Sequence, residues 1–255
     1  MPVTLTPSEV DEMRSAVQEA LADLESIKKE ILSVRDHHTT GARILRDNYW
    51  GKLAAARKRL AEVEFLTGQG DWRSTLRRVF DDYREGLKHG VGVDHWVMGQ
   101  FVVVRSVLDE APRRGSSSES PEEEWAKAWS AVRRGLESMD KAEQMWAHSS
   151  IADLLMVAHG EGWRIPRQMG DMAGMPTERD IVPTDVVTQL ERMLSVTDPP
   201  EWAVLWATFR QFWRWRDWWR DEDWETAANY GFEYLWRHVK PRMALETPPP
   251  SPSPG

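Results

Sequence analysis

Apolar residues in the first part of the chain recur at spacings that alternate between three and four. The run comprises Val10, Met13, Val17, Ala20, Leu24, Ile27, Ile31 and Val34. This spacing is typical of a heptad seam, so it predicts one long helix that packs against one long helical partner. The segment Thr6-Pro7-Ser8-Glu9 has the form of a capping box with proline at the first helical position, and it predicts where this helix begins.

A second helix with similar spacing follows the segment 36–41. Its apolar positions are Leu45, Tyr49, Leu53, Ala56, Leu60 and Val63. The short connection favours an antiparallel hairpin within the chain. Pairing with a second chain would use the same seam, so self-association through the N-terminal heptad helix is the alternative.

Helical spacing continues through most of the remaining sequence. We expect helices over 72–88, 94–110, 121–138, 140–159, 184–196, 199–220 and 223–239. Capping residues at Ser120, Asp140 and Asp198 mark three of the expected starts, and the pairs His89-Gly90 and His159-Gly160 have the form of helix ends. Strand-like alternation is almost absent, and the fold class we predict is all-α.

Composition and charge exclude several classes of protein to which this chain could belong. The 255 residues contain no cysteine and carry a formal charge of −8, which argues against disulfides and against a general nucleic-acid partner. No apolar run is long enough to span a bilayer, and the start Met1-Pro2-Val3-Thr4 lacks the features of a signal peptide. We therefore expect a cytoplasmic protein without a membrane partner. Fifteen tryptophans are the compositional feature that most needs an explanation.

One sequence pattern occurs twice. Arg84-Glu85-Gly86-Leu87 precedes Trp96, and Arg133-Arg134-Gly135-Leu136 precedes Trp146, with offsets of 49 between the leucines and 50 between the tryptophans. Each tryptophan opens a largely apolar helix. An internal repeat of this length indicates stacked helix pairs, extended here by the serine-rich segment 111–120.

The join between two of these helices resembles the tetratricopeptide-repeat family. Phe65 to Trp72, with Gly68 and the pair Gly70-Asp71, is followed by an aromatic and a small-large pair at Tyr83 and Gly86-Leu87. The resemblance covers roughly residues 60 to 240, and the units depart from the family consensus in length. It implies an irregular TPR-like helical array that binds proteins without catalysis.

A second resemblance rests on two further segments. Asp94-His95-Trp96 with Gln100, and Phe209-Arg210-Gln211-Phe212 with Trp218-Trp219, are similar to divergent repeats that accompany caspase-like and CHAT peptidases in bacterial conflict systems. It implies a peptidase or defence effector as the partner protein.

These patterns together predict five segments. They are an N-terminal heptad-type helical hairpin over 1–64, TPR-like helix pairs over 65–163, an irregular linker over 164–183, Trp-rich C-terminal helices over 184–243 and a disordered proline-rich tail over 244–255.

Tryptophan and arginine alternate near the C-terminus, between Trp202 and Trp224. Two aromatic stripes cover too much of one helix for packing on a single side. In residues 210 to 225 four arginines meet five carboxylates, which leaves a net charge of −1 and argues against a nucleic-acid surface. Core packing, a protein-binding surface, and a pocket for a small ligand or nucleic acid are the three interpretations.

Residue types that act in catalysis or metal binding are present, but not at the spacings that such sites require. His37-His38 lacks the spacing that places two ligands on one helix face, and Gly90-Val91-Gly92 lacks the lysine of a phosphate loop. Glu122-Glu123-Glu124 lies where a helix start favours negative charge. We therefore expect no catalytic residue, no metal and no cofactor.

The sequence thus favours a non-enzymatic protein-interaction adaptor or regulator. The residues expected to contact a partner are Trp72, His95, Trp96, Trp129, Trp146, Arg210, Trp213, Arg214, Trp215 and Trp219. One alternative is a substrate or inhibitory partner of a caspase-like or CHAT protease, cleaved in an exposed linker at Arg113 and Arg114. The other is a small-ligand or nucleic-acid binder that uses the Trp/Arg segment.

Overall fold

The computed structural model is built of helices, as the spacing of apolar residues predicts. It describes residues 7–33, 40–89, 95–108, 120–164, 180–219 and 222–244. Within these ranges no β-sheet forms, and the one bridge pair joins Arg164 to Asp180. The chain divides into two compact units, the first within Met1–Val93 and the second within Asp94–Pro252. The boundary between the units therefore follows Val93, whereas the sequence predicted a boundary near residue 64.

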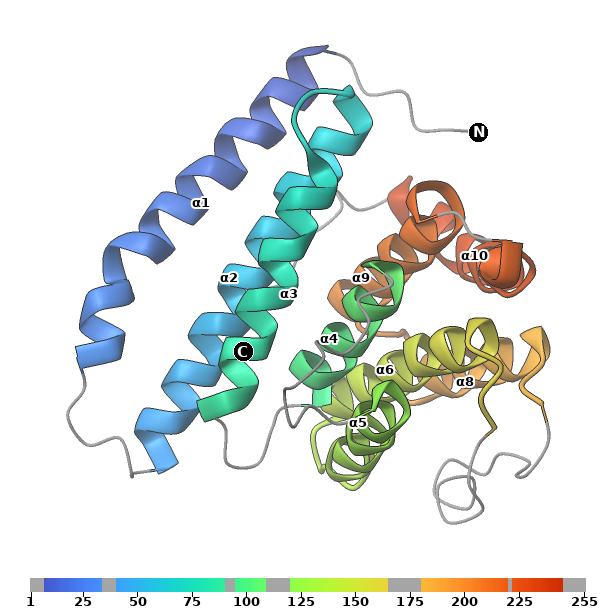
Figure 1. Cartoon of the computed structure of the whole chain (residues 1–255). Coiled ribbons are helices and arrows are strands. Elements are labelled where there is room, and N and C mark those ends of the chain that lie inside the picture. Colours follow the sequence, from blue (N-terminus) through green and yellow to red (C-terminus); the bar gives the residue numbers. More distant parts are fainter. Residues whose placement is uncertain are drawn as a thin grey trace. The chain divides into compact units, whose positions relative to one another are not determined.

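The first unit consists of three helices, α1 (Pro7–Ser33), α2 (Thr40–Thr67) and α3 (Trp72–His89). The central helix α2 packs against both neighbours (Figure 1). Leu21, Leu24 and Ile31 of α1 pack against a cluster of Tyr49, Trp50 and Leu53 on α2. The expected internal pairing is therefore present, but α3 belongs to the same unit as the hairpin.

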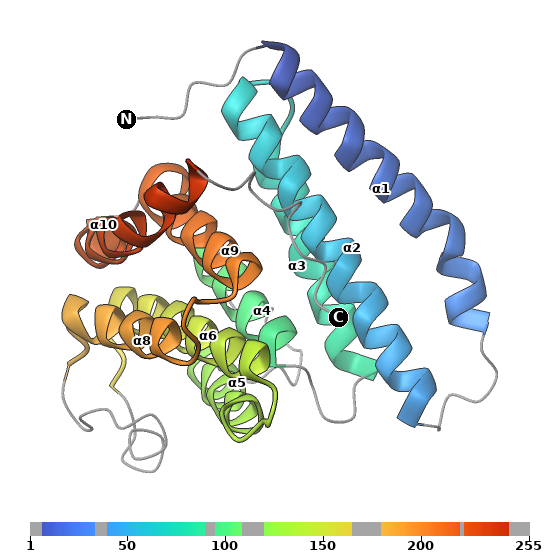
Figure 2. The same cartoon turned by 180° about the vertical axis from the view of Figure 1, so that it is seen from behind.

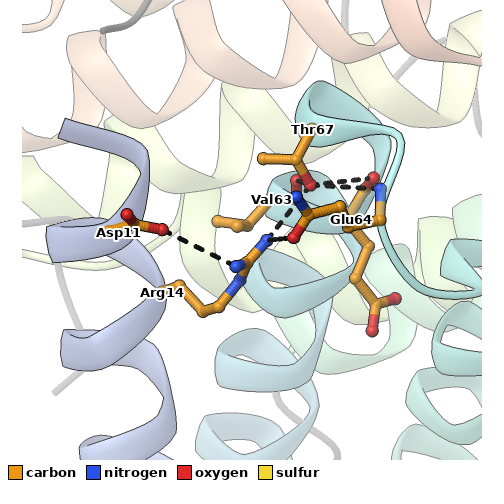
Figure 3. Close-up of polar contacts among 6 residues, drawn as sticks. Asp11, Arg14, Val63, Glu64 and Thr67 are labelled. Atoms are coloured by element: carbon orange, nitrogen blue, oxygen red, sulfur yellow. Dashed lines mark hydrogen bonds and ion pairs between the residues drawn. The ribbon is translucent and has the colours of Figure 1, made fainter. Parts of the chain in front are cut away.

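Polar contacts fix the orientation of α1 on α2. The Arg14 guanidinium donates to the Thr67 hydroxyl at 3.3 Å and to the Gln69 side-chain oxygen at 3.0 Å (Figure 3). Asp11 lies 3.7 Å from the same guanidinium. One face of α1 is thereby held at the C-terminal end of α2.

A second arginine connects all three helices of this unit. Arg57 of α2 donates to both oxygens of Asp82 on α3, at 2.6 and 2.5 Å, and to Glu25 of α1 at 3.1 Å. Burial raises the pKa of Asp82 to about 6, because the cost of desolvating the carboxylate exceeds the stabilisation from Arg57. The three helices are therefore joined by one ionic contact, which is buried at Asp82 and exposed at Glu25.

The turn from α2 to α3 follows the expected glycine-rich join. Gly68 and Gly70 have φ angles of +64° and +92°, which glycine adopts without strain. The Asp71 carboxylate accepts from the Ser74 backbone N–H at 3.1 Å and so caps the start of α3. Local sequence therefore determines this turn.

The second unit is arranged around α6 (Lys141–Gly160), which is buried from Ile151 to Ala158. Its other elements are α4 (His95–Leu108), α5 (Pro121–Leu136), α8 (Pro183–Ser195), α9 (Trp202–Trp213), the π-helical turn η1 (Arg214–Trp218) and α10 (Glu222–Met243). The helices α4, α5 and α8 pack against α6, and α10 packs against α8 and α9 (Figure 2). The β-branched run at residues 102–104 is helical within α4, in line with the all-α prediction.

Two of the three expected caps form. Ser120 and Glu123 make a reciprocal capping box at α5, and Asp140 accepts from the Ala142 N–H at 2.8 Å at α6. The cap expected at Asp198 is wrong, because α9 begins only at Trp202 and its N-cap residue Glu201 makes no side-chain capping bond. The start expected at Thr6 and the end expected at Gly90 lie outside the described residues.

Glycines allow close packing between helices in both units. The position expected for the left-handed glycine, in the pair His159-Gly160, is wrong by two residues, because Gly160 is still helical and lies against Trp224, and the glycine with positive φ is Gly162, at +67°. The duplicated glycines also face neighbouring helices: a Cβ at Gly86 would lie 3.0 Å from the Trp50 Cβ, and one at Gly135 would lie 2.8 Å from the His95 Nε2. Both copies of the repeated pattern thus mark a tight helix contact.

Candidate partner-binding surface

Five aromatic rings form a continuous row along α9 and α10. We call Trp202, Trp206, Phe209, Phe232 and Trp236 the aromatic row. Neighbouring ring centroids on α9 lie 5.6 Å apart, for Trp202 to Trp206 and for Trp206 to Phe209. Phe209 stacks on Trp236 at 5.5 Å and contacts Phe232 at 5.0 Å. The three tryptophans are half-buried, so the row joins two helices and also reaches solvent.

An arginine lies over each end of the aromatic row. The Arg242 guanidinium is 4.8 Å from the Trp202 ring, and that of Arg216 is 3.4 Å from the Phe232 ring. Arg242 also donates to the Pro200 carbonyl at 2.6 Å, and Arg216 forms an ion pair with Asp217. These cations therefore already have partners within the chain, which reduces their availability to phosphate groups.

A groove of about 370 Å³ lies between α8 and α10. It is lined by Val187, Asn229, Tyr230, Glu233, Tyr234 and Arg237. Tyr230 is 54% exposed, a large value for an aromatic side chain beside a groove. Burial raises the pKa of the Tyr234 phenol, and Glu191 adds to this shift while Arg237 opposes it. The groove thus combines aromatic rings with charges of both signs.

Five of the expected partner-contact residues lie in the core. The exposed fractions are 5% for His95, 2% for Trp129, 6% for Arg214, 0% for Trp215 and 3% for Trp219. In this fold their side chains cannot form an accessible surface. The prediction that Arg214, Trp215 and Trp219 form an accessible surface near the C-terminus is therefore wrong. The side chains of Trp215 and Trp219, in and directly after the π-helical turn, point into the core.

A buried carboxylate explains the position of Trp215. Its indole N–H donates to Asp153 at 3.2 Å, and the other oxygen of Asp153 accepts from the Gln100 amide at 3.0 Å. Trp215 also makes edge contacts with Trp219 at 5.3 Å and Trp224 at 4.8 Å. Arg214 donates to the Gln211 side chain at 3.0 Å within the same region. Core packing therefore accounts for this part of the segment.

His95 lies between a serine and a carboxylate. Its Nδ1 is 3.1 Å from the Ser150 hydroxyl, and its Nε2 is 2.9 Å from Glu143. The hydrogen bond with His95 lowers the pKa of Glu143 despite the opposing effect of burial. Ser150 is 5% exposed within α6, so the hydrogen bond between it and His95 lies in the core. The arrangement orients His95 at the contact with Gly135.

The other expected partner-contact residues are half-buried. They are Trp72 in the first unit, and Trp96, Trp146, Arg210 and Trp213 in the second. Arg113 and Arg114 lie outside the described residues. No group of three or more His, Asp or Glu residues capable of holding a metal ion occurs in the ranges that the structure describes.

Four aromatic residues of α10 that line the groove or the aromatic row were not among the residues predicted from the sequence. Phe232 and Trp236 complete the aromatic row, and Tyr230 and Tyr234 line the groove. Each pair has a spacing of four, which places two rings on one side of a helix. The spacing of four could have identified these pairs from the sequence. The larger number of tryptophans in α9 and η1 led the prediction to that segment instead.

Comparison with known proteins identifies no relative of this chain. No protein-family model, no curated protein and no solved structure matches it significantly. Among the described helices, none is long and apolar enough to cross a membrane.

Proposed function

We propose that this protein is a non-enzymatic interaction adaptor or regulator that binds another protein through α10. The observation that carries the proposal is that α10 has aromatic residues on each of two sides, of which Tyr230 is exposed and Tyr234 and Trp236 are half-buried. Tyr230 and Tyr234 line the groove beside α8, and Phe232 and Trp236 belong to the aromatic row beside α9. Exposed and half-exposed aromatic residues are enriched at the centres of protein interfaces.

The charges around α10 also favour a protein over a nucleic acid. Glu233 and Arg237 line the same groove, so both signs of charge meet there. A phosphate backbone requires a predominantly basic surface, whereas a protein interface accommodates mixed charges at its rim. Arg216 and Arg242 are engaged within the chain, which further supports this choice.

A pull-down from the source cell tests the proposal. Wild-type protein is compared with Tyr230→Ala, which removes the most exposed ring of the groove, and with Met139→Ala as a control for an exposed apolar residue elsewhere. Met139 is 96% exposed and lies in the turn between α5 and α6. We expect specific partners to be depleted by Tyr230→Ala and retained by Met139→Ala.

A second measurement locates the contact on α10. Amide hydrogen exchange of the captured complex should slow in Glu222–Met243 relative to the free protein. An unchanged set of partners in Tyr230→Ala together with unchanged exchange in α10 would contradict the proposal.

A further inference from the structure

The helix α1 has a negatively charged stripe on its outer face. Glu12, Glu19, Asp23 and Glu30 are all exposed. At about 100° per residue these positions fall within roughly 40° of one another, and they span about 27 Å along the helix. Leu21 and Arg14, which hold α1 to α2, lie on the opposite side of α1. We call these four residues the acidic stripe.

The helix α3 has a positively charged stripe on its outer face. Arg73, Arg77 and Lys88 are exposed, and the Arg84 side chain is 38% exposed. These four positions fall within roughly 60° of one another and span about 22 Å. Leu76, Val79 and Tyr83, which are buried, occupy another side of α3. We call these four residues the basic stripe.

The two stripes match in length and are opposite in charge. We propose that the acidic stripe of one copy of this chain binds the basic stripe of a second copy. The occupant is a second copy because the matching surface is carried by the same three-helix unit. Within one molecule the stripes cannot meet, since α1 and α3 both use other faces to pack against the central helix α2.

Ion pairs within α3 do not remove this complementarity. Arg84 contacts Asp81 at 2.5 Å and Lys88 contacts Glu85 at 2.7 Å, but these are exposed pairs that can exchange partners. Half-buried aromatic residues adjoin the basic stripe, because the Arg73 guanidinium lies 4.6 Å from the Trp72 ring and that of Arg84 lies 5.4 Å from the Phe80 ring. The surface therefore combines charge with apolar area.

The contact joins two different surfaces, so it is heterologous. Such a contact continues from copy to copy and produces a ring or an open chain rather than a simple two-fold dimer. The interaction depends on exposed charges, so it should weaken as salt screens them. We expect self-association that increases with protein concentration and decreases with ionic strength.

Sedimentation velocity on the full-length protein measures this association. One variant reverses the acidic stripe with Glu12→Lys, Glu19→Lys and Asp23→Lys, which changes the charge of the stripe from −4 to +2. A second variant reverses the basic stripe with Arg73→Glu, Arg77→Glu and Lys88→Glu, which changes the charge of the stripe from +4 to −2. In each variant both stripes have the same sign, and we expect association on the order of tenfold weaker or more. In an equal mixture of the two variants each stripe again meets its opposite, so association should return.

Two further measurements make the result decisive. Arg78→Glu is the matched control, because Arg78 is exposed on α3 but about 100° away from its neighbour Arg77. It should associate like the wild type, and circular dichroism should show native helix content in every variant. A wild-type protein that stays monomeric at submillimolar concentration and low salt overturns the proposal. Association that persists in both variants, or an equal mixture of the variants that stays monomeric, also overturns the proposal.

Discussion

Gly160→Ala tests the close packing between α6 and α10. A Cβ at this position would lie 1.6 Å from the Trp224 Nε1 and 2.3 Å from its Cδ1. Carbon atoms in favourable contact are about 3.5 to 4.0 Å apart, so the indole or the helix would have to move. Trp224 is 7% exposed and packs against Trp215 at 4.8 Å, which leaves the ring little room.

The expected loss of stability follows from two opposing terms. Overpacking of a core costs about 1 to 3 kcal/mol, and more where the neighbours cannot relax. Alanine is better than glycine in a helix by about 1 kcal/mol, an advantage reduced at the final residue of α6. Because the clash distances are far below normal contact, we expect a net destabilisation of about 2 kcal/mol, or a lower Tm by roughly 4 to 8 °C.

Gly99→Ala provides the matched comparison. A Cβ at Gly99 in α4 would lie 3.9 Å from the Ser150 Cβ, which is an ordinary contact. This variant should gain about 0.5 to 1 kcal/mol from helix propensity. Thermal unfolding followed by circular dichroism compares both variants with the wild type. A Gly160→Ala variant as stable as the wild type would show that Trp224 does not require glycine at this position.

Three further predictions concern buried or capping groups, and urea denaturation checks each of them. Asp82 has a pKa raised from 3.8 to about 6, so its contribution to stability is present below about pH 4 and is lost as the pH rises through 6, by up to about 3 kcal/mol. Asp82→Asn should remove this part of the pH dependence, and an unchanged profile would contradict it. Asp153→Ala should cost about 3 kcal/mol, because Gln100 and Trp215 lose their acceptor; a loss below 1 kcal/mol would count against that network. Ser120→Ala should cost about 1 kcal/mol through loss of the α5 cap, and no change would show that the cap is unimportant.

The helices could be predicted from the sequence because their determinants are local. The capping box at Ser120 and Glu123 acts over three residues, and the glycine turn at Gly68 and Gly70 is determined by backbone conformation. The heptad spacing of α1 likewise predicted a helical partner, and α2 fulfils that role. Periodicity and capping thus sufficed for the all-α fold.

The positions of the tryptophans could not be predicted in the same way. Trp215 is buried because Asp153, 62 residues earlier in the chain, accepts its indole N–H. Trp213, two residues before it, is half-buried on another side of the helix. Both are tryptophans that adjoin Arg214 in the sequence, so only the tertiary arrangement distinguishes them. The expected surface therefore included residues that form the core.

The π-helical turn Arg214–Trp218 has a consequence for insertions and deletions. Its closing bond runs from the Trp219 N–H to the Arg214 carbonyl at 2.7 Å, one residue longer than an α-helical turn. In effect the turn accommodates one additional residue. A deletion of a single residue within this turn would convert it to an ordinary α-helical turn and let the side chains that follow keep their orientation, whereas a deletion within α9 would rotate them by roughly 100°. After a deletion within α9, Trp218 and Trp219 would leave their positions in the core, so the π-helical turn is the part of this segment that tolerates a change in the number of residues.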